Sequence, residues 1–451
     1  MATDLELAYN ALKNKQIAYD RLWAYYDGNQ PLIYSASRLR ELFRNVDARF
    51  TQNWCAVVVD SAIDRLNLGR FQIEENEQVT KQLNTLWLST EMGLDSDDAH
   101  LAAMVTGEAF VIVWKEDGGD LEAYYNDPRM AYVRYDPENP RQKLWAAKWW
   151  QIDEKRWRLT IYYPDHLEYY ESSSVDLSVY TKFQPADPPE AVNPFGAIPV
   201  FHLRLNRRII KGELNRSITD LQDAVNKLLS DMMIAAEFAA LPQRYTISQM
   251  EPGELKNAPN EIWNLPAGDG VGQQTQAGQF AAADLTNYGT QINELSSAIG
   301  VISRTPRHYF YAQGGDPSGE ALIAMESPLT KKVQRYIERF TATWQKVAAF
   351  MLELQGVAVD PMSITPIFDP VETVQPRTEA DIREINVRSG IPLVTTLRRE
   401  GWEDTELDQM AKDQAEEQLR QADLAQAYMA QARTSFDQPA DQQTEQEDDQ
   451  Q

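Results

Sequence analysis

Cysteine is nearly absent from the sequence, since the 451 residues contain only Cys55. One cysteine cannot form an intrachain disulfide, and it lies in an apolar run, Cys55-Ala56-Val57-Val58-Val59, which predicts core packing and fits a reducing compartment. Histidine is also scarce: the chain has His100, His166, His202 and His308. None of them is spaced with another histidine or with a cysteine as metal ligands are, so we expect neither a structural zinc site nor any other cofactor.

The motifs that hold nucleotides or activate a serine are missing as well. The sequence contains neither GxxxxGK[ST] nor GxGxxG, which cradle phosphates, and it has no GxSxG nucleophile elbow. No apolar run approaches the roughly 20 residues that cross a bilayer, and the first residues, MATDLELAYNALKNKQ, are charged rather than signal-like. We therefore expect a soluble, non-enzymatic protein without a membrane partner.

Positive charge is in short supply. Lys and Arg number 43 against 68 Asp and Glu, which gives a formal net charge of −25. Proteins that hold a phosphate backbone tightly are normally basic, because Lys and Arg displace the counterions of the nucleic acid. The balance argues against static DNA binding and is compatible with a surface past which DNA slides. Acidity that serves only solubility explains the same balance.

Apolar residues are not scarce: they make up 43% of the chain, so most of it should fold. Helical spacing opens the sequence between Leu5 and Leu22, and a buried-strand pattern appears at Phe110–Trp114. Residues 157–162 alternate between apolar and polar faces. Residues 1 to about 210 therefore predict an α+β domain with an antiparallel sheet, and the length allows two or three domains.

A seven-residue apolar repeat marks a long helix over about 217–240. Its members are Leu214, Leu221, Leu228 and Ala235, interleaved with Ile218, Val225, Met232 and Ala239. At about 1.5 Å per residue the helix would span roughly 36 Å, and Pro242 ends it. A narrow seam between neighbouring helices and a core helix of a globular domain explain the repeat equally well.

Turns and helices alternate after Pro242. Residues 242–281 are rich in Pro and Gly and contain short strand-like runs. From about Thr434, Gln, Asp and Glu dominate, which predicts a disordered tail. Between them the pattern predicts a helix at 282–299 ended by Gly300, a loop at 301–317, a helix at 318–355 bent at Pro328, and helices at 379–389, 393–400 and 405–433.

Three acidic groups are candidates for chemistry, and each has a plainer explanation. Asp95-Ser96-Asp97-Asp98 is similar to part of a calcium loop but lacks its Gly and terminal Glu, which favours charges at a helix start. Asp60 and Asp64 share a helical face, where an ion pair with the adjacent Arg65 is the commoner arrangement. Glu237 stands in an apolar stretch, where burial is costly in a monomer and a subunit interface or an aqueous channel would tolerate it.

The loop at 301–317 carries Arg304, Arg307 and His308. These groups would give a weak, salt-sensitive contact with phosphate rather than a reading of base sequence. Pairing with the abundant acids of the chain is an equally supported alternative.

Four stretches, in a fixed order over roughly residues 50–405, carry a family resemblance. They are Asn53–Asp60 (NWCAVVVD); Asp220–Met233 (DLQDAVNKLLSDMM), continuing through Ala235–Arg244 (AAEFAALPQR); Pro306–Tyr309 with Asp316–Leu322 (PRHY and DPSGEAL); and Gly390-Ile391-Pro392 followed by Gly401-Trp402. With these stretches the chain resembles the portal proteins of tailed bacteriophages, in particular those of long-tailed siphophages of Gram-positive hosts.

The resemblance implies a portal fold, in which a mixed α+β wing is joined to a two-helix stem, a small α/β clip, a tunnel loop and a helical crown. It assigns residues 1–216 to the wing, 217–241 to the first stem helix, 242–281 to the clip, 282–302 to the second stem helix, 303–317 to the tunnel loop, 318–375 to a long helix and the return to the wing, 376–433 to the crown and 434–451 to a disordered acidic tail.

The resemblance also implies a function and partners. A portal is a structural ring at one capsid vertex of the virion, through which double-stranded DNA is packaged and ejected. It docks the large subunit of terminase and later a head-completion adaptor. We expect a homo-oligomer of twelve subunits, contacts with the major capsid protein and the scaffold, transient non-specific contact with DNA, and assembly in the host cytoplasm.

The same assignment implies site residues in three places. The tunnel loop would face DNA with Arg304, Arg307, His308, Tyr309 and Gln313; the stem would line the channel or meet the next subunit with Asp220, Asp223, Lys227, Asp231 and Glu237; and the clip would contact terminase or the adaptor with Glu251, Glu254, Lys256 and Trp263. An acidic lumen would repel the DNA backbone and let it pass.

Two other classes compete with this interpretation. Eleven Trp and twenty Tyr beside many carboxylates would suit a carbohydrate-active hydrolase, although most of the Trp residues lie in patterns typical of a core. Another ring or scaffold protein of the virion, such as an adaptor, is the third class, for which 451 residues is large. A species of about twelve subunits would favour the portal, and a monomer that cleaves polysaccharide would favour the hydrolase.

Overall fold

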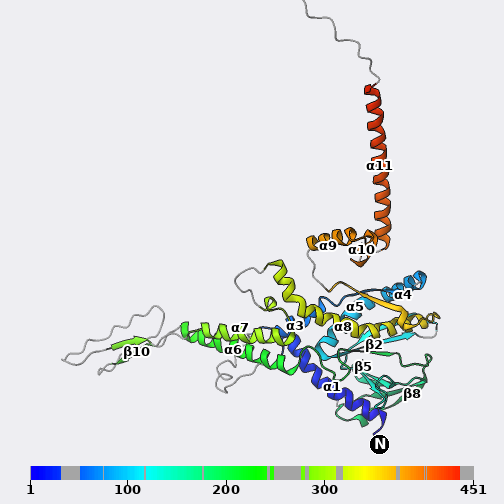
Figure 1. The fold of residues 1–451 in the computed structure, drawn as a ribbon. Helices are drawn as coiled ribbons and strands as arrows, with labels where there is room; N and C mark the ends of the chain where they lie inside the picture. Colours follow the sequence, from blue (N-terminus) through cyan, green and yellow to red (C-terminus); the bar gives the residue numbers. More distant parts are fainter. Residues whose placement is uncertain are drawn as a thin grey trace, which may run out of the picture. The chain divides into compact units, whose positions relative to one another are not determined.

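The computed structural model (Figure 1) consists of two compact units, Met1–Val371 and Glu372–Gln451. The structure describes residues 2–31, 51–74, 76–115, 118–174, 177–240, 244–247, 276–279, 284–310, 318–371, 376–400, 402 and 404–436. The strands and the three hydrophobic clusters of these residues all belong to the first unit.

The first unit mixes helices with strands, so the predicted α+β class is confirmed. Its helices are α1 (Asp4–Tyr26), α3 (Trp54–Ile63), α4 (Glu77–Ser89), α5 (Met92–Thr106), α6 (Arg216–Ala240), α7 (Thr286–Ser303) and α8 (Gly319–Glu353). Its strands are β1 (Leu68–Ile73), β2 (Glu108–Lys115), β3 (Leu121–Asn126), β4 (Ala131–Tyr135), β5 (Lys143–Asp153), β6 (Arg156–Tyr162), β7 (His166–Ser172), β8 (Gln184–Val192), β9 (Val200–Arg204), β10 (Arg244–Ile247), β11 (Gln276–Gln279) and β12 (Ile364–Phe368). Short 3-10 helices lie at Tyr180–Lys182, Arg307–Tyr309 and Pro361–Ser363.

The sheets of the described residues are antiparallel throughout, as the sequence predicts. A five-stranded sheet has the order β4-β5-β6-β7-β8, and a three-stranded sheet has the order β3-β2-β9. Strands β1 and β12 pair although most of the unit's sequence lies between them, and β10 pairs with β11. The pairing of β1 with β12 brings the chain beyond α8 back to its N-terminal part.

The five-stranded sheet is covered on both faces. On one face Tyr9 of α1 stacks on Trp149 at a ring-centroid distance of 5.4 Å, in a cluster that includes Leu159. On the other face Tyr162 packs in a cluster with Phe110 of the three-stranded sheet. The polar face predicted for residues 157–162 is therefore wrong beyond Leu159, because a second sheet covers that side of β6.

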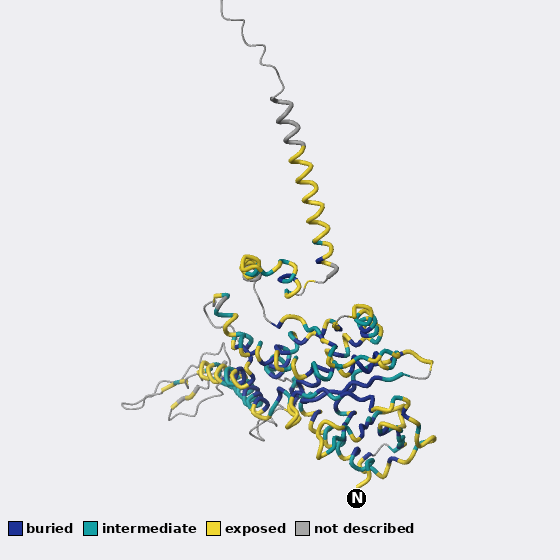
Figure 2. Tube along the Cα trace, turned by 45° about the vertical axis from the view of Figure 1, so that its right-hand side comes forward, coloured by how far each residue is buried: buried dark blue, intermediate teal, exposed yellow. Residues whose placement is uncertain are grey.

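Helix α8 runs through the largest hydrophobic cluster. The indole of Trp344 meets the ring of Trp87 edge-on at 5.5 Å and donates a hydrogen bond of 2.9 Å to Nε2 of His100. Cys55 is buried in the same cluster, as predicted. Figure 2 shows how buried residues concentrate in the strands and in the helices packed on them.

Two glycines fix the path of the chain from the sheets into α6. Gly107, which ends α5, has a φ of +100°, and a Cβ on it would overlap the backbone of Lys211. A Cβ on Gly212 would overlap the carbonyl groups of Met104 and Val105. The two backbones can therefore approach this closely only because both positions lack a side chain.

Helices α6 and α7 lie side by side, and α3 contacts both (Figure 1). Ile218 and Val225, in the first half of α6, are buried, as are Ile292 and Ile299 in α7. From Lys227 to Ala236 no described residue of α6 is buried. The first half of α6 is thus a core helix, and its second half is partly exposed.

The sequence predicts the end of α7 wrongly. The helix continues past Gly300 to Ser303, and Arg304 ends it with a φ of 59°. Gly300 instead allows close packing, since a Cβ on it would lie 3.0 Å from the ring of Phe310. The predicted loop at 301–317 is shorter too, because its first three residues are helical and Arg307–Tyr309 is a 3-10 helix.

Helix α8 contains Pro328 without ending there. Figure 1 shows the yellow-green beginning of the helix running at an angle to the remainder, which agrees with the predicted bend. Ser318 caps its N-terminus by accepting a hydrogen bond of 3.3 Å from the backbone N–H of Ala321.

The second unit is helical in its described residues, with α9 (Pro376–Arg388), α10 (Leu393–Arg399) and α11 (Asp404–Phe436). Arg383 of α9 holds Glu400 with a nitrogen–oxygen distance of 2.6 Å. The first three residues of the predicted tail, 434–436, end α11, and 437–451 lie outside the described residues. No helix among the described residues combines the length and the apolar character that a membrane span needs.

Candidate functional site

The acids of α6 hold different partners within the chain. Asp220 is 57% exposed and lies 3.5 Å from Arg216, whereas the carboxylate of Asp223 accepts a hydrogen bond of 2.7 Å from the hydroxyl of Tyr25 in α1. Burial raises the pKa of the Asp223 carboxyl above its usual value, against the opposing effect of Tyr25. Lys227 and Asp231 form an ion pair one turn apart.

The stem assignment of these four residues stays a prediction. They lie on one helix, and Asp223 already has a partner in its own chain. Glu237 lies in α6 too, but its side chain lies outside the described residues.

The 3-10 helix after α7 is anchored by Glu326 of α8. Nη2 of Arg65 lies 2.7 Å from Glu326 and 3.0 Å from the hydroxyl of Tyr309, and Nε2 of His308 lies 3.4 Å from Glu326. Burial would raise the pKa of Glu326, but the hydrogen bond and the charge of Arg65 outweigh it and hold that pKa below its usual value. The result is a nearly enclosed set of polar groups that ties three elements together.

The ion pair predicted between Arg65 and Asp60 or Asp64 is therefore wrong. Arg65 turns to Glu326, and Asp60 accepts a hydrogen bond of 2.9 Å from the hydroxyl of Tyr26. The reason is the approach of α8, in which Glu326 lies 261 residues further along the chain and offers Arg65 a carboxylate at 2.7 Å.

The residues predicted for the tunnel loop have separate surroundings. His308 and Tyr309 both contact Glu326. For His308 the structure therefore shows the second alternative, pairing with an acid of the same chain. Arg307 donates a hydrogen bond of 3.3 Å to Ser297, and Arg304 lines a cavity. Gln313 lies outside the described residues, and contact of these side chains with DNA stays a prediction.

The four residues predicted for the clip, Glu251, Glu254, Lys256 and Trp263, all lie outside the described residues. Between α6 and α7 the structure describes two antiparallel paired strands, β10 and β11. Tyr245 and Ile247, predicted as part of a strand, are in β10.

The acidic run at 95–98 is the start of α5 rather than a grouped ligand set. Oδ2 of Asp95 accepts a hydrogen bond of 2.7 Å from the backbone N–H of Tyr125. Across the described part of the chain no three His, Cys, Asp or Glu residues are placed to hold a metal ion.

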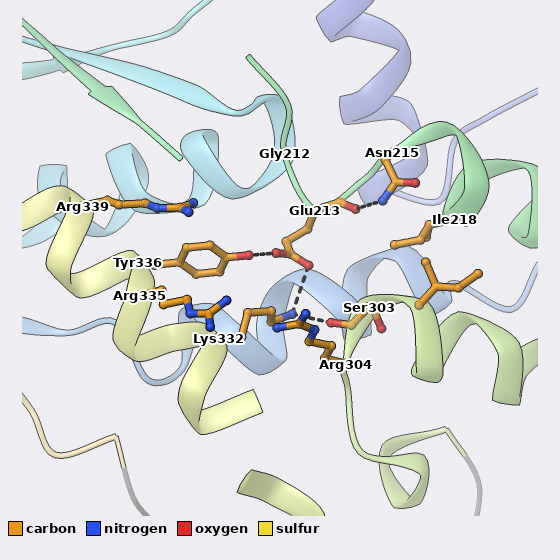
Figure 3. A pocket seen from close by; sticks show the side chains of 11 residues that line it. Gly212, Glu213, Asn215, Ile218, Ser303, Arg304, Lys332, Arg335, Tyr336 and Arg339 are labelled. Carbon is orange, nitrogen blue, oxygen red and sulfur yellow. Dashed lines mark hydrogen bonds and ion pairs between the residues drawn. The ribbon is translucent and has the colours of Figure 1, made fainter. Parts of the chain in front are cut away.

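A cavity of about 220 Å³ lies between α6, α7 and α8 (Figure 3). The acidic residue that lines the cavity is Glu213. Its carboxylate accepts hydrogen bonds from the hydroxyl of Tyr336 and from the ammonium group of Lys332, the latter at 3.0 Å. Lys332 also donates to the carbonyl oxygen of Ser303 at 2.8 Å. Figure 3 shows these bonds joining Tyr336, Glu213, Lys332 and Ser303, with Arg304 beside Lys332.

Sequence reasoning missed the basic side of this cavity. It is formed by Lys332, Arg335 and Arg339 of α8, together with Arg304. The spacing of the first three by three and four residues, which places them on one helical face, was a signal available in the sequence. Glu213 had no such signal, because it precedes α6 in an irregular segment.

Among the described residues the tryptophans do not form an open aromatic platform. Trp87, Trp145, Trp149 and Trp344 are buried, and Trp402 is the one exposed tryptophan within the described ranges. This arrangement speaks against the stacking surface that a carbohydrate-active hydrolase needs.

Comparison with known proteins adds a family to this fold. The family model described as phage portal protein, SPP1 Gp6-like, matches residues 8–420. The portal protein of Mycobacterium phage D29 is 22% identical over 312 residues, and that of Mycobacterium phage L5 is 21% identical over 308 residues. Both alignments cover 64% of this chain and 62% of the relative, so the chain spans less than two thirds of these relatives' length.

A solved structure titled "Virion of native gene transfer agent (GTA) particle" contains a similar chain, with a TM-score of 0.45 and 11% identity over 84% of this chain and 94% of that one. A likeness at this level supports no functional argument. The family match does, because it extends over most of the sequence. The chain belongs to the phage portal protein family of the SPP1 Gp6 type.

Proposed function

We propose that this chain is one subunit of a portal, a ring at one capsid vertex through which double-stranded DNA is packaged and ejected. The observation that carries the proposal is the match of the portal family model to residues 8–420. The portal proteins of two mycobacterial phages are similar over residues that make up 64% of the chain.

The described elements supply parts that such a ring needs. Helices α6 and α7 pair, and the antiparallel strands β10 and β11 lie between them in the sequence. We assign the helix pair to the stem, residues 242–281 to the clip, residues around 303–317 to the tunnel loop and α9–α11 to the crown. The partly exposed second half of α6, where Met233 is 38% exposed, supports this assignment, because a stem helix meets its neighbours in the ring.

The charge of the chain suits passage rather than capture of DNA. With a net charge of −25, the protein repels a phosphate backbone, and a basic residue such as Arg307 would make only brief contacts. We propose a structural role without catalysis, in which terminase docks on the clip and supplies the packaging energy. A head-completion adaptor would then replace it, while the wing contacts the capsid protein and the scaffold.

Oligomeric state tests this proposal. Mass photometry of the purified full chain should show a species of roughly 620 kDa, as expected for twelve copies of a 51.5 kDa chain, and negative-stain electron microscopy should show a ring with a central pore. Coexpression with capsid protein and scaffold should place one ring in each particle. Monomers without a pore under all conditions would contradict the proposal.

A further inference from the structure

The cavity beside Glu213 concentrates positive charge in an acidic protein. Four of its lining side chains, Arg304, Lys332, Arg335 and Arg339, are cationic and Glu213 is anionic, which leaves three positive charges, whereas the chain as a whole carries −25. Cations gathered around a hollow of this size attract an oxyanion.

Two of the four cations are already occupied. Lys332 is nearly buried and bonded to Glu213 and Ser303, and Arg339 donates to the carbonyl oxygen of Leu205. Arg304 and Arg335 are exposed, and neither forms an ion pair within the described ranges. The cavity thus has a fixed floor and two guanidinium groups free to bind a carboxylate or a phosphate with paired hydrogen bonds.

The backbone of Arg304 points to a use for its side chain. Its φ of 59° is left-handed, a conformation that glycine adopts at the end of a helix without strain. An arginine at this position carries a backbone cost that a glycine would avoid. A role for the guanidinium group in the cavity accounts for that cost.

The rim of the cavity favours a protein partner over DNA. Ile302 lines the cavity and is 48% exposed, and the adjacent Val301 is 72% exposed. A phosphodiester backbone has no apolar surface to cover these side chains, whereas a neighbouring protein has. The oxyanion that fits is therefore a side-chain carboxylate.

A suitable carboxylate lies on the opposite side of α6. Ile218 lines the cavity, and Asp220 follows two residues later, about 200° around the helix. Asp220 is 57% exposed, and its contact with Arg216, itself 91% exposed, is a surface pair at 3.5 Å. One copy therefore presents a cationic cavity on one side of α6 and a carboxylate on the other, as a head-to-tail contact requires.

We propose that the carboxylate of Asp220 of one copy enters the cationic cavity of the next copy in the ring and binds between Arg304 and Arg335. The inference rests on the proposed ring and identifies a contact that closes it.

Charge reversal tests the contact in the full-length chain. Asp220→Arg and Arg335→Glu should each raise the protein concentration at which half of the chains are in rings by about tenfold or more, and the double variant should return to within about threefold of the wild type. Arg388→Glu changes the same charge at an exposed arginine of α9 and should leave the concentration unchanged.

Arg304→Gly separates a loss of binding from a loss of folding. Glycine suits the backbone at this position, so the variant should melt at the same temperature as the wild type or higher, and yet form rings less readily. Wild-type assembly of Arg335→Glu or Arg304→Gly, or a double variant that does not recover, would overturn the contact while leaving the ring intact. A wild-type chain that never forms rings would instead contradict the proposed function.

Discussion

Glu108 lies at the centre of a buried polar network that ties α1 to the three-stranded sheet. Its carboxylate, 1% exposed, accepts a hydrogen bond of 2.6 Å from the hydroxyl of Tyr19, lies 2.7 Å from Nε2 of His202 and pairs with the ammonium group of Lys15. Burial alone would raise the pKa of Glu108, but the charge of Lys15 and the bond from His202 outweigh it and lower that pKa to about 2. Glu108 is therefore ionised in the folded protein.

Replacing this acid should be costly. Glu108→Gln leaves Lys15 buried without a counter-charge, so we expect the free energy of unfolding to fall by about 3–5 kcal/mol. Urea unfolding followed by tryptophan fluorescence measures the change. Glu77→Gln, which breaks an exposed pair with Lys81 in α4, is the matched control and should leave the unfolding midpoint where it is. Equal effects of the two changes would contradict the role of the network.

Buried histidines should make stability depend on pH. Burial lowers the pKa of His202 to about 4 and that of His100 to about 3, so both are neutral in the folded protein, whereas in the unfolded chain they titrate near pH 6.5. Below that pH the unfolded chain binds protons that the folded protein does not. Stability is therefore fully present above about pH 6.5 and is lost as the pH falls toward 4, by at most about 1.4 kcal/mol per pH unit for each proton.

Urea midpoints at pH 7, 6 and 5 measure this dependence. His202→Gln should make the urea midpoint depend less steeply on pH, because the unfolded variant then binds one proton instead of two at its buried-histidine positions. Glu108 acts in a lower window: its folded pKa of about 2 lies below the usual 4.5, so its contribution disappears as the pH falls through 4.5 toward 2. A midpoint that rises on acidification from pH 7 to 5 would contradict the assignment of neutral buried histidines.

Single residues were predictable from the sequence where their surroundings are local. Cys55 is buried because its own helix is apolar, which the run around it shows. Arg65 was not predictable in the same way, since its partner Glu326 lies 261 residues away and a closer pair of acids offered a plausible alternative. The three partners of Glu108 are likewise between 89 and 94 residues distant, so no local pattern indicates the network.

At the scale of elements, the crossing of α5 with the segment before α6 depends on two glycines. Gly212→Ala should destabilise the protein by about 1–3 kcal/mol, because the added Cβ overlaps carbonyl groups at the end of α5. Gly289→Ala, inside α7, is the matched control: nothing lies within 4 Å of its added Cβ, and alanine should stabilise the helix by about 0.5–1 kcal/mol. Thermal unfolding of both variants tests the opposite signs, and a neutral Gly212→Ala would show that the two backbones can separate at no cost.

Element types followed from periodicity, and element surroundings did not. Strands β2 and β6 and the long helices α6 and α8 lie close to where the patterns predict them, whereas no pattern predicted β8. The end of α7 was mispredicted because Gly300 packs against the ring of Phe310 rather than ending the helix. The polar face of residues 157–162 was mispredicted because a second sheet packs on the side of β6 that carries Tyr162. The cationic cavity combines three elements, so only its α8 part had a sequence signal.

At the scale of the whole molecule, the first unit buries many apolar side chains, whereas the described residues of the second unit bury few. The three hydrophobic clusters lie between Ala8 and Val371, in the first unit. The described buried residues of the second unit are Thr396, Leu397 and Leu407, and Leu419 of α11 is 67% exposed. Burial of apolar surface is the main driving force of folding, so the first unit should hold its structure by itself.

A chain that ends at Val371 should therefore fold. We expect it to melt cooperatively within about 2 °C of the main transition of the full chain, since the clusters that set this transition are complete in it. The fragment 372–451 should instead lose its helical signal gradually on heating, because a helix that buries little apolar surface is only marginally stable in water. Circular dichroism of both fragments tests this difference. If the shorter chain aggregates or loses its cooperative transition while the C-terminal fragment melts sharply, the clusters do not suffice, and the second unit is part of what folds the first.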